Sequence, residues 1–255
     1  RKAVYKYCIA RNMDRKFFIL LFCIYAFYTG SGLNEAIYYN LTSLEFTLYA
    51  VTDHYYILYP FFLALIYMVV KDYQEQRSFV LIRCGSYMKY FITRYLALIS
   101  VSAFLLAADT VISYMIGILS LEPGNAFIST GDNNVSFYGL QTLYKQIFSN
   151  PFEAIILTQL YTFMGFAFIC IVFMYLLTVL QKGVALCLIF LCYLSSCIAL
   201  SWGVDGNMPY LFLNNYISFH HGIEKACPML IFLIEITAIA FVLFAIGKRW
   251  GIREA

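Results

Sequence analysis

The chain has 255 residues, of which 62% are hydrophobic and 12% charged, and its formal net charge is +3. Soluble domains carry about 25% charged residues. This composition therefore excludes an ordinary soluble domain and predicts a single polytopic membrane domain over residues 1–255, in contact with lipid and not with nucleic acid.

The first sixteen residues are basic, and Tyr5, Cys8, Ile9 and Met13 are spaced to share one face of a helix. This pattern predicts an amphipathic helix over residues 1–16, lying at the cytosolic membrane interface. The apolar run that follows lacks a clear small-x-small cleavage site, so we interpret it as a retained first span and not as a signal peptide.

Six apolar runs are long enough to cross a hydrocarbon core, which needs about 20 helical residues. They are Phe17–Leu33, Leu48–Val70, Tyr95–Leu121, Phe152–Leu180, Gly183–Val204 and Cys227–Gly247. Because open sheets do not survive in lipid, we expect an all-α protein, a bundle of six transmembrane helices. We also expect a helix over Phe137–Phe148, and a re-entrant or surface-lying helical pair between the fifth and sixth spans.

Lysine and arginine set the predicted orientation. Fifteen of the seventeen basic residues fall on the side that carries both termini, and the other side holds only Lys145 and Lys225. The positive-inside rule then places both termini in the cytosol, and we expect a multi-pass protein of a bacterial plasma membrane.

Two carboxylic acids lie inside predicted spans, Asp109 in the third and Glu235 in the sixth. A charge at membrane depth costs at least about 2.5–3.5 kcal/mol, so each group should be protonated, paired or exposed to water. One interpretation is that Asp109, Glu235 and Gln159 line a translocation path. The other is a hydrogen bond between helices, made to Gln159 or Thr158.

The sequence contains no nucleotide-binding loop, zinc-protease motif or nucleophile elbow. Its eight cysteines form no Cys-x-x-Cys pair. The three histidines are His54, His220 and His221. Adjacent helical residues point apart, so we expect no metal site at His220 and His221, even with Glu224 nearby. We interpret Asp53 and His54 as marking only the membrane interface.

The segment between the second and third spans, residues 71–95, is longer than a hairpin requires and reads KDYQEQRSFVLIRCGSYMKYFITRY. In order it presents Glu75, Ser78, Leu81, Ile82, Ser86 and Arg94. This order resembles the signature of type-2 ATP-binding-cassette (ABC) exporter permeases: a Glu, then Gly-Thr, a leucine-rich turn, Pro-x-Ser and a closing Lys. Two positions depart from it, because Arg77 replaces the usual Gly and Cys84 the usual Pro.

The resemblance implies that residues 71–95 form a cytosolic coupling region that contains a coupling helix bound by a separate ATPase. Its candidate coupling residues are Glu75, Ser78, Ser86, Tyr87, Lys89 and Arg94. Arg94 is expected to anchor the third span by snorkelling to the interface. ATP and Mg would belong to the partner, so this chain has no cofactor or catalytic residue of its own.

The same resemblance implies an assembly of two ATPase subunits with two permeases, the second being another copy or a homologue. Small residues of the first and fifth spans would permit close approach of the permeases: Gly30, Gly32, Ser195 and Ser196. The expected function is export of an amphipathic peptide or a hydrophobic small molecule. The alternatives are a membrane-embedded enzyme, or a channel or scaffold without an ATPase. No convergent set of His, Glu or Ser at one depth is visible in the sequence to favour the enzyme.

Overall fold

A computed structural model describes residues 2–74, 82–127, 136–204 and 206–251, and all regular structure in these ranges is helical. The elements are α1 (Lys2–Asn12), α2 (Arg15–Ser31), α3 (Leu33–Tyr38), α4 (Ser43–Thr52), α5 (His54–Tyr56), the π-helix η1 (Ile57–Phe61), α6 (Phe62–Gln74), α8 (Tyr87–Ser120), α9 (Ser136–Ile147), α10 (Pro151–Val179), α11 (Lys182–Trp202), α12 (Asn214–Ile217), α13 (Phe219–Lys225) and α14 (Pro228–Gly251).

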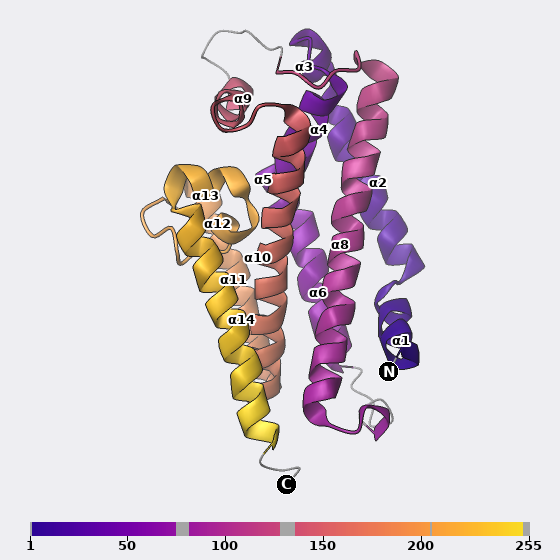
Figure 1. Ribbon diagram of the computed structural model, residues 1–255, viewed down its shortest axis with the longest axis vertical. Helices are drawn as coiled ribbons and strands as arrows, with labels where there is room; N and C mark the ends of the chain where they lie inside the picture. The colour runs from indigo at the N-terminus through magenta and orange to yellow at the C-terminus, as the bar shows by residue number, and fades with distance from the viewer. Residues whose placement is uncertain (1, 75–81, 128–135, 205, 252–255) are drawn as a thin grey trace.

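Six helical stretches in this part of the chain are long and apolar enough to cross a membrane, as predicted. They are Arg15–Tyr38, Ser43–Gln74, Tyr87–Ser120, Pro151–Val179, Lys182–Trp202 and Pro228–Arg249. Both termini lie at one end of the bundle, here called the terminal end, and α3 and α9 lie at the far end (Figure 1). Apolar side chains from all six spans fill the core, including Tyr25, Phe62, Leu98, Phe166, Ile189 and Val242.

The second span is not the uninterrupted helix that the sequence predicted. Thr42 and Glu45 form a reciprocal capping box at the start of α4. The helix then stops at Asp53, whose carboxylate accepts hydrogen bonds from the N–H groups of Tyr55 and Tyr56 at 2.9 and 3.0 Å. Pro60, which has no N–H, lies inside η1, and a π-type turn accommodates such a missing donor. The span therefore contains two irregular points near its middle.

The predicted N-terminal helix is present as α1, but its apolar side is packed against the third span. Val4 and Cys8 are buried with Tyr90 and Ala97 of α8. The hydroxyl groups of Tyr5 and Ser100 are 2.6 Å apart, within hydrogen-bond distance. The helix is thus part of the bundle's terminal end.

The predicted helical pair before the sixth span is also present, as α12 and α13, and it packs onto α10. Thr162 donates to the carbonyl oxygen of Ile217 at 2.9 Å, and Tyr161 donates to that of Asn215 at 2.5 Å. A Cβ atom on Gly165 would lie 2.0 Å from the Tyr216 carbonyl oxygen, so only glycine permits this approach. The protein itself therefore satisfies this non-spanning backbone, as burial away from water requires.

Candidate functional site

Residues 82–86, directly before α8, lie at the terminal end of the bundle and are called the elbow here (Figure 1). The elbow is shorter than the predicted region 71–95, because residues 71–74 continue α6 and residues 87–95 already belong to α8. A helical turn at 82–84 ends at Gly85, which has a φ of 70°. Ser86 then caps α8 by accepting the N–H of Lys89 at 3.2 Å.

The elbow presents both apolar and basic side chains. Ile82 is 76% exposed, and Arg83 and Lys89 are exposed beside it. Tyr87 is half-buried at the first position of α8. The predicted coupling residues Glu75 and Ser78 lie outside the described residues. What the structure brings together at this end is therefore Ile82, Arg83, Ser86, Tyr87 and Lys89.

Arg94 does not snorkel to the interface as predicted. It is 5% exposed and forms an ion pair with Asp72, which is 2% exposed and lies in the last turn of α6. The Arg94 guanidinium also lies 5.0 Å from the ring centroid of Tyr90. The ion pair could not be predicted from the sequence, because Asp72 lies 22 positions before Arg94 and on another helix.

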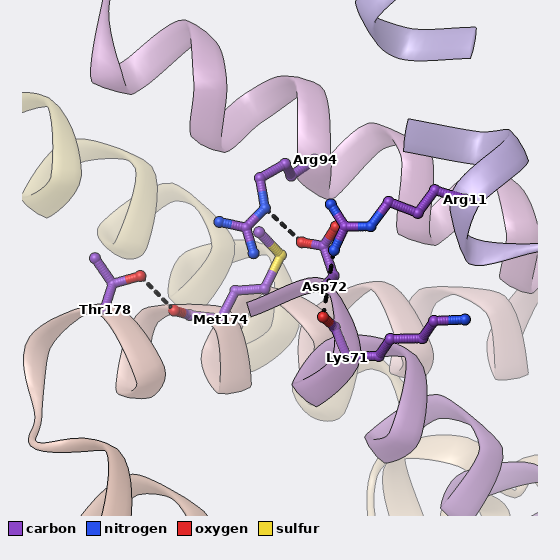
Figure 2. A network of polar contacts seen from close by, with 6 residues as sticks. All are labelled: Arg11, Lys71, Asp72, Arg94, Met174 and Thr178. Atoms are coloured by element: carbon purple, nitrogen blue, oxygen red, sulfur yellow. Dashed lines mark hydrogen bonds and ion pairs between the residues drawn. The ribbon is translucent and has the colours of Figure 1, made fainter. Parts of the chain in front are cut away.

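Arg11 of α1 reaches the same place. It donates to the backbone carbonyl oxygen of Lys71 at 3.4 Å, and Figure 2 shows its guanidinium pointing toward the Asp72 carboxylate. Lys71 in turn lies 3.8 Å from the carboxylate of Asp14, the residue that caps α2. The charges thus join α1, α2, α6 and α8 immediately next to the elbow.

A groove of about 470 Å³ lies between α1, the elbow and α8. Its lining combines apolar and basic side chains: Val4, Tyr5, Arg83, Cys84, Lys89, Ile92, Thr93 and Leu96. Cys8 is buried nearby, and burial, followed by the negative charge of Asp72, raises the pKa of its thiol. The groove offers an apolar contact surface with a positive rim.

Asp109 lies in a buried polar cluster between the first three spans. Its carboxyl group is beside the Tyr56 hydroxyl. The Tyr25 hydroxyl of α2 is next to Thr29 and within electrostatic reach of Asp109. Among the described residues, Asp109 Oδ1, Thr29 Oγ1 and both phenol oxygens are buried without a hydrogen bond of normal geometry. The cluster contains a carboxyl group and three hydroxyl groups, which can hold or pass a proton.

Gln159 does not bond to Asp109, which was one of the two predicted arrangements. It donates to Thr110 Oγ1 at 3.0 Å, whereas Thr158 is 3.5 Å from the Tyr144 hydroxyl. Gln159 and Thr110 line a groove of about 580 Å³ between α8 and α10. The rest of its lining is apolar, for example Leu106 and Phe163. The groove is suited to an apolar or amphipathic chain.

Glu235 is fully buried, and in the described part of the chain neither of its carboxylate oxygens has a hydrogen-bond partner. It lies within electrostatic reach of Tyr161 on α10 and Tyr216 on α12. Glu235 is therefore near the place where α10 and α12 meet.

The four small residues predicted for a permease–permease interface occupy different environments. Gly30 and Ser195 are exposed. Gly32 packs against Tyr49, because a Cβ atom there would lie 3.2 Å from that ring. Ser196 is fully buried and accepts the backbone N–H of Leu213 at 3.0 Å. The interface prediction now depends on Gly30 and Ser195.

The structure also assembles a group that the sequence did not predict. His220 and His221 do not point apart, since their ring centroids are 4.4 Å apart and both rings lie beside His54. Burial, together with the charges of His221, His54 and Lys225, lowers the pKa of His220 well below its usual value. The expectation that His220 and His221 point apart is wrong, and His54, which was expected only to mark the membrane interface, lies in one cluster with them.

Comparison with known proteins identified no relative of this chain. No protein-family model matches the sequence, and no curated protein or solved structure matches the chain.

Proposed function

We propose that this chain is the membrane-spanning subunit of an ATP-driven exporter, energised by a separate ATPase that binds the elbow. In this proposal two such permeases, or this one and a homologue, assemble with two ATPase subunits in a bacterial plasma membrane, with both termini cytosolic. ATP and Mg are bound by the ATPase. The cargo is an amphipathic peptide or a hydrophobic small molecule.

The observation that carries the proposal is the elbow's attachment. Ile82 and Arg83 are exposed directly before α8, and α8 is joined to α6, the helix that ends the second span, by the buried pair Asp72–Arg94. A force applied to the elbow would therefore move the second and third spans as one unit. A merely solvated linker would need no buried ion pair at its base, since burying two charges costs several kcal/mol per ion before pairing.

Two further observations support it. α1 packs along α8 and borders the groove beside the elbow, so a protein bound there would contact both elements. The groove between α8 and α10 is mostly apolar and has Gln159 and Thr110 as its polar positions. Such a lining suits an amphipathic cargo better than a polysaccharide.

The test is co-purification with the ATPase encoded by a neighbouring gene. Ile82→Asp and Arg83→Glu should reduce capture of the ATPase strongly, because interface hot spots are few and truncating one costs about 2 kcal/mol or more. Tyr38→Asp is the matched control, since Tyr38 is 79% exposed and lies on α3 at the far end. Unchanged capture by both elbow variants would contradict the proposal.

A membrane-embedded metal-dependent enzyme is the second candidate, and one observation favours it. His54, His220 and His221 converge although 166 positions separate His54 from His220. This candidate predicts that the purified chain has a catalytic activity in the absence of any ATPase. It would be rejected if cargo stimulated ATP hydrolysis by the permease–ATPase complex but not by the ATPase alone.

A further inference from the structure

The three histidines lie where two separate elements of the chain meet. His54 is the first residue of α5, directly after the break in the second span. His220 and His221 are in α13, the second helix of the pair that precedes the sixth span. In Figure 1, α13 lies in the half of the bundle away from the termini, and α5 lies near the middle of its length.

Their ring nitrogens have the spacing of metal ligands. One ligand atom from each histidine can be chosen so that all three lie within 4.8 Å of one another. His54 Nδ1 and His220 Nε2 are 3.3 Å apart. Two imidazole nitrogens bound tetrahedrally to one zinc ion, at about 2.0–2.1 Å each, are separated by roughly 3.3–3.4 Å. Zinc binding requires the third nitrogen to come to the same spacing from the other two.

The surroundings of the three rings are compatible with a bound metal ion. His220 and His221 are each 4% exposed. Burial keeps imidazole neutral, which is the form that binds metal.

We propose that His54, His220 and His221 bind a divalent transition-metal ion of the zinc class, with the fourth position left to water or another small ligand. Imidazole is a preferred ligand of zinc, and three histidines with one open position are a known zinc arrangement. The ion joins the break in the second span to the α12–α13 pair. It thereby links the second span to the segment before the sixth span, away from the elbow.

The first measurement is metal content of the full-length chain, purified in detergent with a tag that contains no histidine. We expect one zinc per chain after addition of Zn²⁺ and removal of excess. X-ray absorption at the metal edge should report three imidazole nitrogens at about 2.0–2.1 Å. This result needs no variant. A chain that retains no metal, or a spectrum dominated by sulfur ligands, would overturn the proposal.

Variants locate the site. His54→Gln and His220→Gln should each weaken zinc affinity by more than the roughly 10–100-fold typical of losing an outer-shell partner. Cys227→Ser should not change it, because Cys227 is exposed at the start of the last span and is not part of the cluster. Equal zinc affinity in the histidine variants and the parent chain would show that zinc binds elsewhere, and would overturn the assignment.

Lys225 provides a variant of opposite sign. Its charge acts on His220 and opposes a bound cation. Lys225→Gln should therefore tighten zinc binding severalfold, an effect that damaged folding would not produce. Zinc should also raise the melting temperature of the parent chain and of Lys225→Gln, since a ligand that binds only the folded state stabilises it. Absence of that shift in both would contradict the proposal.

Discussion

Asp72 and Arg94 form a buried ion pair across the elbow, although one ends the second span and the other lies within the third. Arg11 brings the N-terminal helix to the same point (Figure 2). Three elements that meet the elbow are thus held together by charges instead of by apolar contact alone. This arrangement is costly unless both partners are present, which makes it testable.

Removing one partner should destabilise the chain strongly. Asp72→Asn or Arg94→Gln leaves a buried charge without its partner, and such changes cost about 3–5 kcal/mol. Replacing both residues with apolar ones, Asp72→Leu with Arg94→Met, should restore most of the stability, because an apolar pair avoids the cost of desolvation. Unfolding in a denaturing detergent, followed by circular dichroism, measures both effects.

Lys89→Gln is the control for this experiment, because Lys89 is exposed near the same elbow. It should change the free energy of unfolding by less than about 0.5 kcal/mol. If Asp72→Asn and Arg94→Gln are as stable as the control, the pair contributes nothing to holding the elbow. If the apolar double variant is stable but no longer supports cargo-stimulated ATP turnover, the pair transmits motion.

The spans could be predicted because burial in lipid requires long apolar helices, and such runs are visible without knowledge of any contact. The α12–α13 pair was visible for a similar reason, as a semi-apolar segment bounded by prolines. The contacts that define the candidate sites were not. The partner of Arg94 and the meeting of His54 with His220 depend on how the helices pack, and sequence spacing does not encode that.

Glycine at position 165 should be essential for the α12–α13 pair. In Gly165→Ala, the new Cβ atom would lie 2.0 Å from the Tyr216 carbonyl oxygen, so the backbone must move. Overpacking of this kind costs about 1–3 kcal/mol. Gly247→Ala, with nothing within 4 Å of the new Cβ atom, should be neutral or stabilising by up to about 1 kcal/mol. Melting temperatures in detergent compare the two; equal values would show that α10 and the pair are not in contact.

Two native cysteines test the orientation. Cys227 is exposed before α14, and Cys84 is in the elbow at the terminal end. If the termini are cytosolic, a membrane-impermeant thiol reagent applied to intact cells should label a chain whose only cysteine is Cys227. It should label one whose only cysteine is Cys84 only after the cells are opened. The opposite pattern would place the elbow outside and exclude a cytosolic ATPase partner.

Cys8 reports on the packing of α1. It is 3% exposed, and burial raises the pKa of its thiol above the usual value. The reactive form is the thiolate. In a chain whose only cysteine is Cys8, alkylation in detergent should therefore be slow at pH 8 and should still be rising above pH 9, where an ordinary thiol approaches its plateau. Denaturation should abolish this difference. A pH profile that matches free cysteine in the folded chain would show that α1 does not pack on α8.

Variants of Asp109 and Glu235 test whether these acids line a proton-linked or water-filled path or only pack between helices. Asp109→Asn and Glu235→Gln preserve shape and remove the acid, and both positions are buried, so assembly with the ATPase should persist. If the acids act in transport, cargo-stimulated ATP turnover of the reconstituted complex should fall about tenfold or more, equivalent to roughly 1.4 kcal/mol. Ser102→Ala is the matched control, since Ser102 is buried in the same helix as Asp109 and donates to the Leu98 carbonyl oxygen of its own helix. It should retain normal turnover. Normal turnover in both acid variants would reduce Asp109 and Glu235 to packing residues, and would leave the groove at Gln159 as the remaining candidate path.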